Sequence, residues 1–249
     1  MATTSLSSPA PVSSRSLPIP RGRYFFTLLS VLMSVTVVVG FWPSYFGPLL
    51  LQGNALRPWV IHLHGVVFIG WMALLLTQVV LAATGRVQAH RKIGNLGILY
   101  GCIVLVMGLV VTFAAPILHV RAGEWDMDRA AGFLPIPFGD MVLFGGFFGA
   151  AVAYRRKPEI HKRFILLATV ALVFAAAGRM AAVVAVPVAL LVWLSPLLIG
   201  IGYDLIKRRG IHPVYAIGFT ALVIAFPRFA LAQSQAWIRI GRFLLRPFI

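Results

Sequence analysis

The feature that most constrains this chain is its apolar stretches, which are long enough to cross a lipid bilayer. Residues 164–203 contain a single charged side chain, Arg179. About 20 apolar residues in a helix, at 1.5 Å per residue, span the hydrocarbon core, so this stretch is too long for one crossing. We expect two crossings here, joined by a tight turn near residues 179–186.

The composition agrees with a membrane class. The chain is 60% hydrophobic and 11% charged, whereas about a quarter of the residues of a soluble domain are charged. Its apolar runs are continuous, unlike the short alternating segments of a transmembrane barrel. The sequence therefore predicts an all-α integral membrane protein, a bundle of about seven transmembrane helices within residues 23–233. The expected spans are 24–40, 59–83, 93–115, 136–154, two within 164–203, and 214–233.

Two flanking segments differ from the bundle. Residues 1–22 are rich in Ser, Thr and Pro and are expected to form a disordered tail. Residues 234–249 are expected to form an amphipathic interfacial tail, because their arginines are spaced three and four residues apart on one helical face. These arginines are Arg239, Arg242 and Arg246, and the side chains expected on the lipid side are Trp237, Ile240, Phe243 and Leu244.

The charge of the chain is strongly positive, at +16 from 22 Lys+Arg and 6 Asp+Glu. The basic residues gather in short turns between apolar runs, which favours a role in orientation and lipid contact over nucleic-acid binding. Their distribution predicts a multi-pass protein of a bacterial inner membrane with a cytoplasmic N-terminus. Seven spans then place the C-terminus outside. The arginines of the C-terminal tail would instead favour the cytoplasmic side, so either the charge bias is overruled there or the count is wrong by one span.

Histidines recur at the basic turns. A basic residue precedes each of them by four positions, in the pairs Arg86 and His90, Lys157 and His161, and Arg208 and His212. Each histidine opens an odd-numbered span, so all three are expected on one side of the membrane. Neutral imidazoles from different helices of a bundle can hold haem iron, and basic neighbours can pair with its propionates. The alternative is an ordinary basic turn at the membrane edge.

Other ionisable residues are predicted near the opposite side. These are His64, Asp140, Arg179 and Arg228. Ionisable groups within a membrane are candidates for function, but a structural Asp–Arg pair between helices explains the same residues. His64, rather than His62, is expected to point inward.

The third expected span carries a row of small residues. His90, Gly94, Gly97, Gly101 and Gly108 fall on one helical face. Such a face allows close approach of another helix, or of a flat cofactor.

Motifs of common enzyme classes are missing. The sequence contains no GxSxG, HExxH or phosphate-binding loop, and Cys102 is the only cysteine, which excludes a CxxC motif. Nothing indicates a nucleotide-driven enzyme, and the pattern leaves open whether the protein is an enzyme at all.

A resemblance rests on three motifs, HxHG (62–65), GRxxxHRKxG (85–94) and RRKPEIHKR (155–163). With them the chain resembles uncharacterised bacterial multi-pass membrane proteins and, more distantly, cytochrome-b-type membrane haem proteins. The second resemblance implies haem b held by His64, His90 or His161. This chain has Asp140 where a second outer histidine would be needed, which leaves one haem near the cytoplasmic face.

The sequence thus supports three hypotheses. In the first, a redox subunit holds haem iron with His90 and His161, places Arg86, Arg91 and Lys162 near the propionates, and exchanges electrons with a quinone or another membrane subunit. In the second, a transporter or binding protein takes a small anionic or lipid-like ligand through His64, Asp140, Arg179 and Arg228. In the third, the protein is an accessory subunit needed only for assembly.

Overall fold

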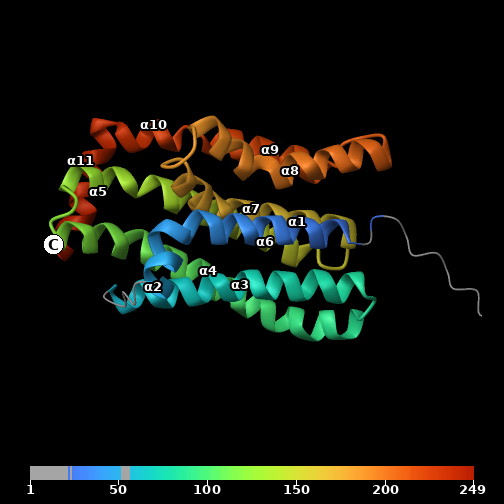
Figure 1. Cartoon of the computed structure of the whole chain (residues 1–249). Coiled ribbons are helices and arrows are strands. Elements are labelled where there is room, and N and C mark those ends of the chain that lie inside the picture. Colours follow the sequence, from blue (N-terminus) through green and yellow to red (C-terminus); the bar gives the residue numbers. More distant parts are fainter. Residues whose placement is uncertain (1–21, 23, 52–56) are drawn as a thin grey trace, which may run out of the picture.

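The computed structural model describes residue 22, residues 24–51 and residues 57–249, and all of the regular structure in this part is helical (Figure 1). Seven helical segments are long and apolar enough to cross a membrane, so the predicted bundle is confirmed. The predicted tail 1–22 lies outside the described residues except for Gly22. The seven segments are Phe25–Leu51, Trp59–Ala83, Val87–Arg121, Met127–Ala153, Pro158–Met180, Val186–Arg208 and Pro213–Gln233.

Four of these segments are single helices, and the other three are divided. The helices are α1 (Phe25–Phe41), α2 (Gly47–Leu51), α3 (Trp59–Ala83), α4 (Val87–Arg121), α5 (Met127–Phe133), α6 (Pro135–Ala153), α7 (Pro158–Met180), α8 (Val186–Arg208), α9 (Pro213–Ala225), α10 (Arg228–Gln233) and α11 (Gln235–Leu245). The predicted span 59–83 coincides with α3, and the turn predicted within 164–203 falls between α7 and α8.

The predicted third span was too short. We expected residues 93–115, followed by a loop over 116–135, but α4 runs from Val87 to Arg121 and α5 begins at Met127. Hydropathy identifies only the apolar centre of a helix. Polar residues can extend the same helix beyond the hydrocarbon core of the bilayer. The carboxylate of Asp126 caps α5 by accepting the backbone N–H of Arg129 at 2.7 Å.

Prolines divide the first and last spans. Pro43 lies in a π-helical turn, Trp42–Phe46, that joins α1 to α2. Pro227 separates α9 from α10, because proline has no N–H to donate and its ring displaces the carbonyl one turn earlier. The helix therefore restarts at Arg228.

The helices alternate between two ends of the bundle (Figure 1). The start of α1 and the turns α3–α4, α6–α7 and α8–α9 lie at one end, here called the basic end. At the other end, here called the C-terminal end, α5 and α11 lie together.

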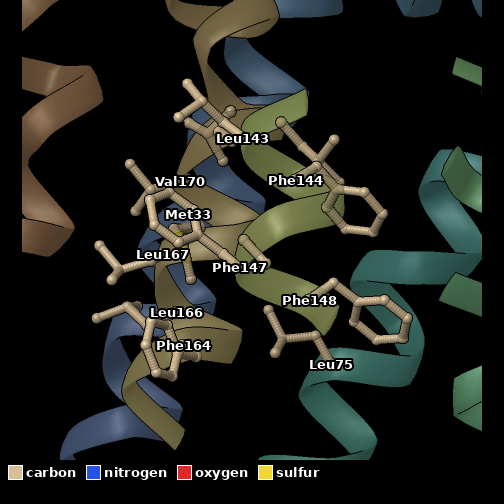
Figure 2. Packing of buried hydrophobic residues seen from close by; sticks show 14 of the residues in the cluster. Met33, Leu75, Leu143, Phe144, Phe147, Phe148, Phe164, Leu166, Leu167 and Val170 are labelled. Carbon is tan, nitrogen blue, oxygen red and sulfur yellow. The ribbon is translucent and has the colours of Figure 1, made fainter. Parts of the chain in front are cut away.

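The central helix of the bundle is α7. In its most apolar window 67% of the residues are buried, against 39% or less in the other six segments. It packs against α1, α6 and α8. In Figure 2, Phe147 lies on the α7 side of α6, and Phe144 and Phe148 lie on the α3 side.

A charged residue is buried at the basic end of this central helix. The guanidinium of Arg163 is 1% exposed and makes a two-point contact with the fully buried carboxylate of Asp204 on α8, one bond of which, from Nε, is 3.0 Å long. Its Nη1 also donates to the Glu159 carboxylate at 2.8 Å. This pair ties α7 to α8 where apolar packing alone would leave a charge unpaired.

Removing the carboxylate should destabilise the bundle strongly. Asp204→Asn leaves the buried charge of Arg163 without its main partner, which costs about 3–5 kcal/mol. We expect a clearly lower thermal unfolding midpoint of the purified protein in detergent. Arg208→Gln is the control, since its exposed bridge to Glu159 at 3.3 Å is worth below about 1 kcal/mol. Equal midpoints for the two variants would contradict a structural role for the pair.

Candidate functional site

His90, the first predicted ligand of haem iron, lies in the first turn of α4, and its ring contacts the last part of α3. Its Nδ1 is 3.2 Å from the backbone oxygen of Gln78. A carbonyl oxygen only accepts, so this bond requires the proton on Nδ1 and leaves the Nε2 lone pair available. The imidazole is half-buried at the basic end.

Gln78 also presents its side-chain amide to this ring. With the amide nitrogen turned toward the imidazole, it would donate to Nδ1 at 2.6 Å, and the amide oxygen would accept the N–H of Gly94 at 2.9 Å. The two arrangements require opposite tautomers of His90, because the bond to the backbone oxygen places the proton on Nδ1 and the bond from the side-chain amide leaves it on Nε2. Gln78 therefore controls which ring nitrogen carries the proton.

The second predicted ligand, His161, repeats this arrangement in the next hairpin. It lies in the first turn of α7, and its Nδ1 donates to the backbone oxygen of Ala151, near the end of α6, at 2.8 Å. His90 and His161 are close enough for their charges to interact. The structure thus places two half-buried imidazoles at the basic end, each held through Nδ1 by the preceding helix.

The third histidine of the repeat behaves differently. His212 caps the start of α9, where its Nδ1 accepts the N–H of Val214 at 3.2 Å. Burial lowers the pKa of His212 below its ordinary value, and the positive charges of Arg163 and Arg208 lower it further. Of the three histidines that were expected to be equivalent, only His90 and His161 therefore have similar surroundings.

The basic residues expected near a cofactor divide into two groups. Arg86 and Arg91 are exposed at the basic end. Lys162 instead donates to the carboxylate of Glu159 at 2.6 Å and lies 4.9 Å from the ring centre of Phe26. Arg86 and Arg91 are thus the cations that remain available to an anion beside the two histidines.

The glycine face of α4 serves helix packing. The ring of Phe148 occupies the space where a side chain at Gly101 would be, and the sulfur of Met141 does the same at Gly108. A Cβ at Gly97 would lie 3.4 Å from Leu74. Of the two expected uses, the structure therefore supports close packing of α4 on α3 and α6.

The ionisable residues expected near the opposite side form two separate groups. In the first, the guanidinium of Arg228 donates to the carboxylate of Asp140 at 2.6 Å, and both are buried. Arg228 also lies 5.4 Å from the ring centre of Phe174 and 5.0 Å from that of Phe229. This group is a structural tie between α10 and α6, enclosed by aromatic rings of α7 and α10.

The second group is His64 and Arg179. The ring of His64 packs on Phe68 with 4.2 Å between centroids, and its buried Nδ1 has no hydrogen-bond partner in the described chain. Arg179 donates to its own helix at Ala175 O and lies 4.3 Å from the ring centre of Phe41. His64 and Arg179 are within range of each other's charge. No carboxylate among the described residues pairs with Arg179.

The buried Arg163–Asp204 pair was not predicted from the sequence. Arg163 was counted as part of a basic turn, and Asp204 was not singled out. An acidic residue near the end of a long apolar stretch was the available signal, because a buried carboxylate requires a buried cation. Within the described residues there is no group of three or more His, Cys, Asp or Glu side chains that could hold a metal ion.

The lowered pKa of His212 gives the protein a predictable pH dependence. The unfolded chain takes up a proton near the ordinary histidine pKa of about 6.5, before the folded chain does. The contribution of His212 to stability should therefore be complete above that pH and decrease as the pH falls below it. His212→Asn keeps a capping side chain that does not titrate.

We expect the wild-type thermal midpoint to fall further than that of His212→Asn between about pH 7.5 and 5.5. Because all other titrating groups are the same in the two proteins, their effect on the thermal midpoint cancels in the comparison. Parallel curves would show that His212 titrates equally in the folded and unfolded chain.

Comparison with protein-family models, with curated proteins and with solved structures gives no match for this chain. Its resemblance to uncharacterised membrane proteins and to cytochrome-b-type haem proteins therefore stays a prediction that rests on its histidine motifs.

Proposed function

We propose that this protein is an electron-transfer subunit that holds one b-type haem between His90 and His161. The observation that carries the proposal is that each of these two imidazoles is held through Nδ1 by the preceding helix, His161 at the backbone oxygen of Ala151 and His90 at Gln78. Histidines that bind metals commonly donate their second nitrogen in this way, which fixes the ring and the tautomer.

The donor set fits such a group. Haem iron takes neutral imidazole nitrogens, and the bond from His161 to Ala151 O leaves its Nε2 unprotonated. The backbone oxygen of Gln78 can hold the Nδ1 proton of His90 in the same way. Arg86 and Arg91 are exposed cations that suit carboxylate groups. A bound haem would supply one-electron transfer, while the two hairpins hold the imidazoles and their protons.

Its setting is a membrane, since seven helices are of spanning length and apolar composition and therefore contact lipid. We infer from the Lys and Arg distribution that the basic end, with the N-terminus, faces the cytoplasm of a bacterial inner membrane. The electron partner on that side would be a quinone or another membrane subunit.

Absorption spectroscopy tests the proposal. The purified protein, after reconstitution with haemin, should show a Soret band, and His90→Ala or His161→Ala should each remove most of it. His212→Asn is the matched control, because it changes a histidine at the same end without touching either hairpin. Unfolding midpoints of each variant separate loss of haem from loss of fold.

Two results would contradict the haem proposal. One is a reconstituted wild-type protein without a Soret band, which favours an accessory subunit. The other is a band that survives in the His90→Ala, His161→Ala double variant.

A specific observation favours a second function, the binding of a small anionic or lipid-like ligand at His64 and Arg179. The Nδ1 of His64 is buried without a partner. Arg57 lies within charge range of Arg179, and neither arginine is paired with a carboxylate in the described chain. An anion between them would satisfy all three groups.

This second function predicts stabilisation by an amphiphilic carboxylate. Oleate should raise the thermal midpoint of the wild-type protein, and Arg179→Gln should abolish the increase. Arg91→Gln, an exposed arginine at the other end, should leave the increase intact. An unchanged response in Arg179→Gln would argue against a site at this arginine.

A further inference from the structure

The C-terminal helix α11 is docked on the bundle. Trp237 donates its indole N–H to the backbone oxygen of Ala131 on α5 at 2.9 Å. Gly241 lies against Ala131, where an added Cβ would be 2.7 Å from the Ala131 Cβ, and Leu245 is fully buried. Trp237 was expected on the lipid side, and its contact with α5 corrects that expectation. The docking fixes which face of α11 is exposed.

The chain end beyond α11 is also held. The guanidinium of Arg121, at the end of α4, donates twice to the backbone oxygen of Phe248, at 2.6 and 3.1 Å. Arg239 and Arg242 of α11, and Arg246 in the 3-10 turn Arg246–Phe248 that follows it, are therefore presented by a fixed scaffold of α4, α5 and α11.

These arginines line a groove between α5 and α11. The groove has a volume of about 430 Å³, and its lining residues are Met127, Arg239, Arg242, Phe243 and Arg246. Arg242 forms an ion pair with Asp128. Arg239 and Arg246 make no ion pair in the described chain, so the groove has an excess of positive charge. Such a groove selects an anion, and guanidinium groups match the oxygens of phosphate.

Apolar side chains lie on the exposed part of the same helix. Phe243 is 77% exposed, and Ile240 and Leu244 are also exposed. In a bilayer such side chains enter the boundary between headgroups and acyl chains, while the arginines stay at the phosphate level. The anion that meets both surfaces at once carries a phosphate and an acyl chain.

We propose that the groove between α5 and α11 is a binding site for the headgroup phosphate of an anionic phospholipid. Arg239 and Arg246 contact the phosphate, Arg242 remains braced by Asp128, and Phe243 packs along the first carbons of an acyl chain. This site is independent of the proposed haem and lies at the other end of the bundle.

Lipid-dependent stability of the full chain tests this site. The delipidated protein in detergent should gain thermal stability with phosphatidylglycerol, and much less with phosphatidylcholine or inorganic phosphate. The double variant Arg239→Gln, Arg246→Gln should bind phosphatidylglycerol roughly thirtyfold more weakly, from about 1 kcal/mol per arginine. Its midpoint without lipid should match the wild type, because neither residue makes an ion pair.

The matched control is Arg155→Gln, Arg156→Gln, which removes the same charge from the exposed α6–α7 turn at the basic end. It should keep the wild-type response to phosphatidylglycerol. An equal loss of response in both double variants would overturn the proposal in favour of general charge attraction. An equal gain with inorganic phosphate would overturn it in favour of a free-anion site.

Discussion

The arrangement of the bundle depends on where its buried charges are paired. In lipid, apolar side chains gain little by moving from acyl chains to another helix, so polar contacts and close packing decide which helices associate. The charge of Arg163 is buried at the basic end of α7, and Asp204 must lie beside it. This requirement fixes α8 against the central helix.

Other polar contacts extend the same principle along the bundle. Trp71 of α3 donates to the hydroxyl of Thr169 at 3.3 Å, and Trp193 of α8 donates to the backbone oxygen of Val170 at 2.9 Å. Arg228 with Asp140 ties α10 to α6. Each contact is directional and is enclosed by apolar side chains. It therefore favours one rotation of the helix about its axis over other rotations that would bury a similar apolar area. The α3–α4 and α6–α7 hairpins, which carry His90 and His161, are held within this arrangement of helices.

The sequence was sufficient for the number and approximate limits of the spans, because bilayer thickness imposes a length that hydropathy reveals directly. It was insufficient for the ends of α4, since a polar turn such as 87–92 continues a helix without an apolar signal. The sequence was also insufficient to identify which charged residues form buried ion pairs. Asp140 and Arg228 were recognised and an Asp–Arg pair was one alternative, but the choice between Arg179 and Arg228 was left open, and Arg163 was counted within a run of basic residues. Which cation is buried depends on contacts between distant segments, and spacing along one helix contains no record of them.

The distribution of the acidic residues connects the structural and functional parts of this molecule. The chain has only 6 Asp+Glu for 22 Lys+Arg, and each carboxylate has a structural task. Those tasks are the contact of Glu124 with His119, the α5 cap by Asp126, and the ion pairs of Asp128, Asp140, Glu159 and Asp204. With all carboxylates committed, the cations that they do not reach are exposed to anions from outside the chain.

Some of these remaining cations lie in the exposed basic turns, and others lie at the three proposed sites, namely beside His90 and His161, beside His64, and in the groove of α11. Arg86 and Arg91 belong to the first place and Arg179 to the second. Arg239 and Arg246 belong to the third. The lipid site proposed at the third place would also reconcile the basic tail with the orientation expected from the charges of the turns. Cations held by a docked helix and neutralised by lipid phosphate have less tendency to reorient the chain than cations in a free loop. Each of the three proposed sites thus lies where cations have no carboxylate partner within the described residues.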